Sequence, residues 1–89
     1  MNNFPKKILI IDDNPQDIEL VRIYLRMNGF NNAVFALTGD EGIGLISEEK
    51  PDLIVVDASL PGLHGYEVVK QIRQSYKNIK IGWCNYWVR

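Results

Sequence analysis

Two uninterrupted aliphatic runs, both followed by or ending on aspartate, constrain the fold of this chain more than any other feature of its sequence. Ile8–Ile11 comes after a basic start and stops at Asp12. The segment Asp52–Asp57 contains the second run, Leu53–Val56, and itself ends on a carboxylate. Short apolar runs without polar alternation are typical of strands buried on both faces, as in parallel sheets. We therefore expect a parallel sheet with carboxylates at the ends of two of its strands.

Helix patterns alternate with strand patterns along the rest of the chain. Helices are expected from Pro15 to about Asn28, from Thr38 to about Glu49 and from Gly65 to about Tyr76, with further strands over Ala33–Leu37 and from Ile79 onward. Gly29 is the expected left-handed cap of the first helix, and Thr38 and Glu41 have capping-box spacing. Short connections of this kind allow only right-handed crossovers, which predicts an open α/β sheet.

The composition excludes several classes of protein. Eighty-nine residues are enough for one domain, and 46% hydrophobic residues are too many for a disordered segment. The formal net charge of −1 argues against a nucleic-acid partner, and the single cysteine, Cys84, excludes an internal disulfide. No apolar run approaches the ~20 residues of a membrane helix, and Met1–Lys7 does not resemble a signal peptide. We expect a cytoplasmic protein without a membrane partner.

The carboxylates at the strand ends form the candidate functional site. Open α/β sheets bind ligands outside the carboxyl ends of their strands, where the strand order reverses. If the first strand lies between the second and the third, Asp12, Asp13 and Asp57 converge at that point. Like charges so close together need protons or a cation, and hard oxygen ligands favour Mg²⁺ over Zn²⁺. A carboxylate beside Mg²⁺ can attack phosphorus and form an aspartyl phosphate.

A plainer interpretation applies to each aspartate taken singly. Asp at a strand end commonly caps the next helix or lies in a loop, and Asp13 or Asn14 could cap the helix that begins at Pro15. The grouping of three carboxylates at one edge of one sheet raises the case for a metal or phosphoryl site. The expected geometry leaves both interpretations open.

The segments Ile8–Asn14 and Leu53–Gly65 resemble the receiver domain of two-component response regulators. That family has an acidic pair after its first strand, and after its third strand an aspartate with a proline four residues later and a glycine eight residues later, the spacing of Asp57, Pro61 and Gly65. The resemblance covers residues 6 to about 81. It implies a flavodoxin-like, three-layer α/β/α fold with strand order 2-1-3-4, and a loop shaped by Pro61 and Gly65.

The resemblance also implies a role for each residue of the site. Asp57 would accept a phosphoryl group from a sensor histidine kinase or a phosphotransfer protein, so the chain is expected to be a phosphoacceptor and not an enzyme. Asp13, Asp57 and the backbone carbonyl of Ser59 would bind Mg²⁺ directly, and Asp12 would act mostly through water.

The end of the sequence departs from the family pattern. The family has Thr or Ser at the end of strand four, where this chain has Asn85, and no lysine here matches the one that pairs with the phosphoryl group from strand five. We therefore expect a single, truncated receiver domain over residues 1–89, without the fifth strand and the last two helices. A frameshift or premature stop, and a short variant that self-associates, are both consistent with this ending.

Truncation would leave apolar surface uncovered. We expect the fourth strand to be a bare edge and the sheet face with Ile8, Ile10, Leu53 and Val55 to be exposed, so a homodimer through strand four or the aromatic segment Trp83–Val88 should form.

Other functions compete with the phosphoacceptor. One is a receiver-like interaction module that cannot be phosphorylated, and binding of beryllofluoride or acetyl phosphate with Mg²⁺ would separate the two. A phosphatase with an aspartate nucleophile is disfavoured because that class has an Asp-x-Asp pair after strand one, whereas Asp12 and Asp13 are adjacent.

Overall fold

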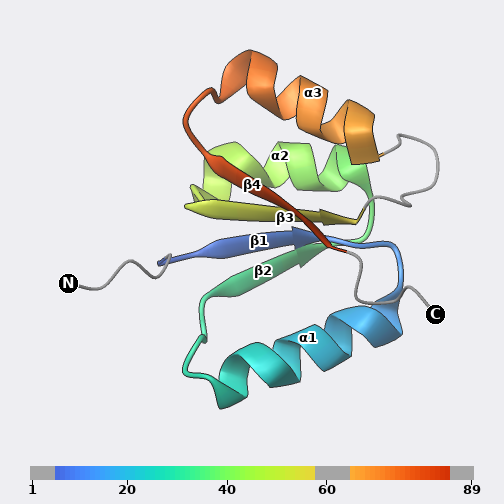
Figure 1. Ribbon diagram of the computed structural model, residues 1–89, viewed down its shortest axis with the longest axis vertical. Helices are drawn as coiled ribbons and strands as arrows, with labels where there is room; N and C mark the ends of the chain where they lie inside the picture. Colours follow the sequence, from blue (N-terminus) through green and yellow to red (C-terminus); the bar gives the residue numbers. More distant parts are fainter. Residues whose placement is uncertain (1–5, 58–64, 85–89) are drawn as a thin grey trace.

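The computed structural model describes residues 6–57 and 65–84, in which strands and helices alternate (Figure 1). The elements are β1 (Ile8–Ile11), α1 (Pro15–Met27), β2 (Ala33–Ala36), α2 (Gly39–Glu49), β3 (Leu53–Asp57), α3 (Gly65–Ser75) and β4 (Lys80–Cys84). This is the predicted order of elements, with boundaries within a residue or two of those expected. None of the helices in these residues is long and apolar enough to span a membrane.

The strands form one parallel sheet in the order β2-β1-β3-β4, as predicted. β1 is central, and its last residue, Ile11, is in register with Ala36 on one side and Val56 on the other. Asp12 therefore follows β1 at the level of Asp57, the last residue of β3. The register brings the two carboxylate-bearing strand ends to the same edge of the sheet.

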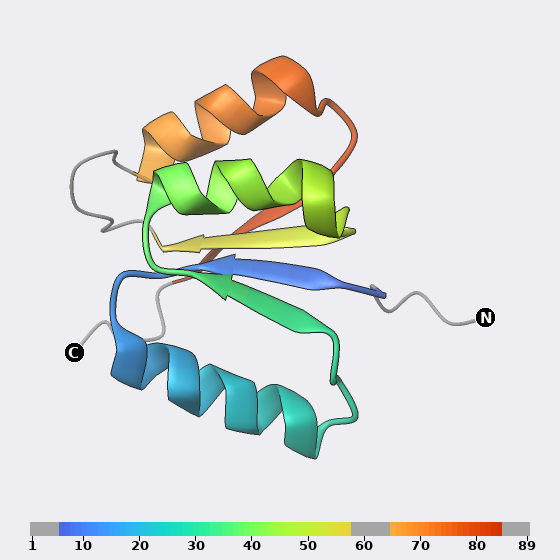
Figure 2. The same ribbon diagram turned by 180° about the vertical axis from the view of Figure 1, so that it is seen from behind.

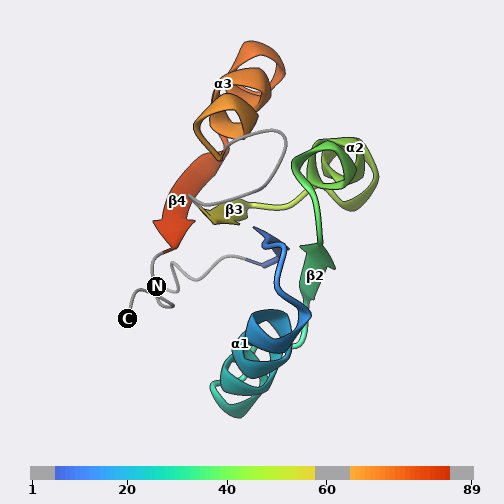
Figure 3. The same cartoon turned by 90° about the vertical axis from the view of Figure 1, so that its right-hand side faces the viewer.

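The helices cover the two faces of the sheet unequally, which gives three layers (Figure 3). α2 and α3 lie together on one face, and the view from behind shows them side by side across the sheet from α1 (Figure 2). The core is buried between the sheet and these two helices; its largest members are Leu9, Ile11, Ile46, Ile54, Val56, Val68 and Ile72. α1 lies on the other face, beneath β1 and β2, and no other helix in the described part of the chain covers that face (Figure 3).

Local signals explain where α1 begins and ends. Asn14 is its N-cap, and Gly29, with φ of 90°, follows Asn28 in the left-handed conformation that the sequence predicts there. The Gly29 N–H donates to the Arg26 carbonyl at 3.1 Å, and the Phe30 N–H donates to the Leu25 carbonyl at 2.8 Å. This pair of bonds is a Schellman motif, which satisfies the last carbonyls of the helix.

α2 begins at the predicted capping residues. The Glu41 N–H donates to Thr38 Oγ1 at 3.1 Å, and Glu41 Oε1 in turn accepts from the Leu37 N–H at 2.9 Å. The helix ends at Lys50, whose φ of 51° and ψ of 57° are left-handed. A lysine gives no sequence signal for this conformation, which glycine or asparagine usually supplies.

The exposure of the sheet face under α1 differs in part from the expectation. Ile8 and Ile10 were expected to be exposed but are only 5% and 3% exposed, because β1 is central and α1 lies beneath it. Leu53 and Val55 on β3 are half-buried. The strongly exposed apolar side chains on this side of the molecule belong to α1 itself, among them Leu20 and Tyr24.

Candidate functional site

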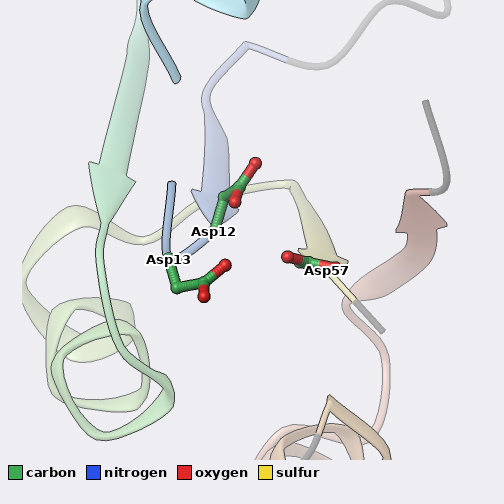
Figure 4. Close-up of side chains that lie close together, drawn as sticks. All are labelled: Asp12, Asp13 and Asp57. Carbon is green, nitrogen blue, oxygen red and sulfur yellow. The ribbon is translucent and has the colours of Figure 1, made fainter. Parts of the chain in front are cut away.

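The candidate site lies at the carboxyl edge of the sheet, where β1 and β3 end side by side (Figure 4). Asp12 and Asp13 follow β1 and Asp57 ends β3, and carboxylate oxygens from all three lie within 4.8 Å of one another. Asp12 and Asp57 are buried, whereas Asp13 is exposed to solvent. Figure 4 shows the carboxylates of Asp13 and Asp57 turned toward each other. The convergence predicted from the sequence is therefore present.

Asn14, and not Asp13, caps the helix that follows. The Asn14 side-chain oxygen accepts hydrogen bonds from the N–H groups of Gln16 and Asp17, at 2.9 and 3.3 Å. This settles the choice left open by the sequence, because Asp13 has no capping role and its carboxylate is available to the site. The Asn14 N–H also donates to Asp12 Oδ1 at 3.0 Å, which fixes the orientation of the Asp12 carboxylate.

The electrostatics of the site disfavour three negative charges in the absence of a cation. Burial raises the pKa of Asp12, and the negative charges of Asp17 and Asp13 raise it further. The hydrogen bond from the Asn14 N–H and a side-chain hydrogen bond with Asp57 act in the opposite direction but do not cancel the rise in the pKa. A positive charge placed among these oxygens would relieve this repulsion.

The donor set fits a small, hard cation. Carboxylate oxygens are the side-chain ligands that Mg²⁺ prefers, and it needs only one or two of them because it keeps several waters. Asp13 and Asp57 face each other across the gap, and the exposure of Asp13 gives a route from solvent. The remaining coordination positions would then be free for water or phosphate oxygens, so the site suits phosphoryl chemistry.

Several predicted site residues lie outside the described part of the chain: Ser59, Pro61 and Asn85. Gly65 is described, and it is the buried first residue of α3. Asp17, which the sequence interpretation overlooked, is 9% exposed in the first turn of α1 and adds negative potential at Asp12. Its position in the first turn of a helix gives no sequence signal for this role, because acidic residues are common there in solvated positions.

Comparison with known proteins gives a consistent family. The model of the response regulator receiver domain matches residues 8–84. The chain is 44% identical over 69 residues to the alkaline phosphatase synthesis transcriptional regulatory protein PhoP of Bacillus subtilis, covering 78% of this chain and 28% of that protein. It is 36% identical over 73 residues to the DNA-binding response regulator MtrA of Mycolicibacterium smegmatis, covering 82% and 32%. The chain thus spans about a third of the length of these relatives.

Solved structures agree with this match. The response regulator TrrA of Thermotoga maritima in complex with Mg²⁺ and BeF superposes with a TM-score of 0.78 at 33% identity, over 84% of this chain and 64% of that one. A chain in the complex of the histidine kinase ThkA with TrrA gives 0.80 at 30% identity, over 93% and 74%.

The fold is the flavodoxin-like fold of these structures, with strand order 2-1-3-4 in the described residues. The acidic pair after β1, the aspartate that ends β3 and the family match over residues 8–84 agree with one another. The chain belongs to the response regulator receiver domain family.

Proposed function

We propose that this chain is a phosphoacceptor module of a two-component phosphorelay, with Asp57 as the acceptor and Mg²⁺ as the cofactor. The observation that carries the proposal is the convergence of carboxylate oxygens from Asp12, Asp13 and Asp57 within 4.8 Å at one sheet edge. The ends of two adjacent strands hold these groups, so they are positioned before any ligand arrives. The MgBeF complex of TrrA supports the choice of metal.

The proposed transfer is a single displacement at phosphorus. A carboxylate oxygen of Asp57 attacks the phosphoryl group of a phosphohistidine; the new O–P bond forms as the P–N bond breaks, and the released imidazole nitrogen takes up a proton. Asp13 and Asp57, with the Ser59 carbonyl, would hold Mg²⁺, and Asp12 would orient its waters. Bound Mg²⁺ would neutralise charge on the transferring phosphoryl oxygens.

The partners follow from the same proposal. A sensor histidine kinase or a phosphotransfer protein would supply the phosphoryl group, and the kinase complex of TrrA supports this class of partner. In this proposal residues 1–89 belong to one cytoplasmic receiver domain that receives phosphoryl groups and has no enzymatic role beyond slow self-dephosphorylation. It needs no nucleic-acid or membrane contact, and it forms a homodimer through β4 or the aromatic C-terminal segment.

Labelling with acetyl phosphate tests the acceptor. In the presence of Mg²⁺ we expect the intact protein to gain the mass of one phosphoryl group, and Asp57→Asn to gain none. Asp40→Asn is the matched control, since Asp40 is an exposed aspartate in the first turn of α2 and is not one of the three clustered carboxylates. EDTA should abolish labelling of the intact chain.

Two results would contradict the proposal. Equal labelling of Asp57→Asn and Asp40→Asn would assign the phosphate to another residue. A folded protein that neither labels nor responds to beryllofluoride would instead support the interaction module that cannot be phosphorylated.

A further inference from the structure

A small pocket of about 140 Å³ lies between the C-terminal half of α1 and the outer strand β2. Its lining includes Arg22 and Arg26 of α1, Phe30 and Asn31 of the loop that follows, and Phe35 of β2. The acidic site precedes α1, so the pocket lies at the other end of this helix. Pockets for drug-sized ligands measure roughly 300–1,000 Å³, so this one suits a small ion or a single group of a larger molecule.

The guanidinium of Arg22 is held at the wall of this pocket by an aromatic ring. Its Cζ atom lies 4.6 Å from the centroid of the Phe35 ring, a cation–π contact. Among the described residues its one ion pair is with Glu19, whose Oε1 lies 3.5 Å from Arg22 Nε, and both side chains are well exposed. An exposed pair at this distance is weak. The guanidinium is therefore positioned in advance, and its two terminal nitrogens remain available to a ligand.

Arg26 brings a second positive charge to the pocket, one helical turn after Arg22. An arginine near the end of a helix often donates to the last carbonyls. Here the last carbonyls of α1 already accept the backbone N–H groups of residues 28–30. Within the part of the chain that the structure describes, the Arg26 side chain has no hydrogen bond or ion pair. Helix capping therefore does not occupy this guanidinium.

The donors around the pocket indicate the class of ligand. Two guanidiniums match a group with two negative charges, and arginine forms bidentate hydrogen bonds with phosphate oxygens. The exposed side-chain amide of Asn31, which has no hydrogen-bond partner among the described residues, adds a neutral donor. We propose that Arg22, Arg26 and Asn31 bind a dianionic phosphate group, either the free ion or the phosphate of a small monoester. This site is separate from the phosphoacceptor and does not depend on it.

Titration with inorganic phosphate, followed by ¹H–¹⁵N NMR in EDTA at mildly alkaline pH, tests the site. We expect saturable shifts of the Asn31 side-chain amide and of the Phe35 backbone amide. Arg26→Gln should weaken binding at least about fivefold, because it removes one charge-assisted contact. Lys70→Gln is the matched control, since Lys70 is an exposed cation on α3, across the sheet from α1 (Figure 3). This control should bind phosphate within about twofold of the wild type.

A second substitution should act in the opposite direction. Glu19→Gln removes the carboxylate that pairs with Arg22, so phosphate should bind about two- to threefold more tightly. This variant keeps both arginines, so it tests the pocket even if Arg26→Gln does not fold. Weaker or unchanged binding by Glu19→Gln would contradict a role for Arg22.

Two further ligands define what the pocket selects. Acetate, with one charge, should bind at least about fivefold more weakly than phosphate. Glycerol 3-phosphate that binds more tightly than phosphate would identify a monoester as the ligand, and equal binding of the two would identify the free ion. Equal binding of acetate and phosphate, equal affinities of Arg26→Gln and Lys70→Gln, or shifts confined to residues around Asp57 would overturn the proposal. Labelling of Asp57 needs Mg²⁺ and is measured separately, so failure of this site and failure of the phosphoacceptor can be told apart.

Discussion

Asn14 determines what its neighbour Asp13 can do. By accepting the N–H groups of Gln16 and Asp17, Asn14 satisfies the start of α1 and leaves the Asp13 carboxylate exposed beside Asp57. The same residue donates its own N–H to Asp12. One asparagine thus caps the helix, and the Asp13 carboxylate next to it stays available for the proposed cation.

Asp12 should make the metal-free protein less stable as the pH rises. Burial raises the pKa of Asp12 above its ordinary value of 3.8, so its protonated form favours the fold. That contribution is complete below pH 3.8 and is lost as the pH rises through the raised pKa of the folded state. Asp12→Asn cannot ionise, and its oxygen can still accept the Asn14 N–H.

Urea unfolding in EDTA measures this effect. We expect Asp12→Asn to be more stable than the wild type, by a margin in the free energy of unfolding that grows as the pH rises above 3.8. A margin that stays constant or shrinks as the pH rises would show that burial and the neighbouring negative charges do not raise the pKa of Asp12.

The acidic site shows what a sequence can and cannot predict at the level of residues. Asp12 and Asp57 could be placed because each follows an uninterrupted aliphatic run, and parallel strands end at a common edge. The burial of Asp17 could not be predicted, since an aspartate in the first turn of a helix is usually a solvated residue that interacts with the helix dipole. The choice between Asp13 and Asn14 as the cap was also undetermined, because both residue types are good caps.

Within α2, Gly42 and Gly44 differ in the space around them. A Cβ atom on Gly42 would clash with Ile11 Cδ1 and lie 2.6 Å from Ile11 Cγ1, whereas a Cβ on Gly44 would meet nothing within 4 Å. Ile11 is fully buried in the core and has little room to move. Gly42 therefore allows α2 to approach β1 closely, at the strand end that carries the site.

We expect Gly42→Ala to destabilise the fold by about 1–3 kcal/mol, because overpacking against Ile11 outweighs the better helix propensity of alanine. Gly44→Ala is the matched control in the same helix and should stabilise it by up to about 1 kcal/mol. Thermal or urea unfolding of the two variants checks the difference in sign. Similar effects of both substitutions would mean that the approach of α2 to β1 is not tight.

The left-handed residue at the end of α1 could be predicted from the sequence, whereas the one at the end of α2 could not. Gly29 could be identified as the end of α1, since a glycine after a helical pattern supplies a left-handed residue without steric cost. The left-handed Lys50 at the end of α2 had no such signal. Lys50 lies between α2 and the buried Pro51 that precedes β3, where the chain turns back toward the sheet.

For the molecule as a whole, Mg²⁺ binding should be linked to stability. A ligand that binds only the folded state at about ten times its Kd stabilises that state by about 1.4 kcal/mol. For a domain of this size this corresponds to a rise in Tm of roughly 6–11 °C. We expect scanning calorimetry to show this rise for the intact chain and for Asp40→Ala.

Asp13→Ala should lose most of that rise, because it removes the exposed carboxylate that faces Asp57. If Asp13→Ala responds to Mg²⁺ as strongly as Asp40→Ala does, the metal binds elsewhere.

The central position of β1 has a consequence for synthesis on the ribosome. β1 is made early, but the strand that pairs with its second edge is complete only after the 46 residues from Asp12 to Asp57 have been added. At a synthesis rate of about 5–20 residues per second, this edge of Ile8–Ile11 stays unpaired for roughly 2–9 s, until β3 has been made. During that interval the nascent chain carries a highly apolar strand that can be paired only with β2, on one of its two edges. A chaperone can bind the strand in this time. The carboxylate pair at the end of β1 is likewise made before the residue it will face.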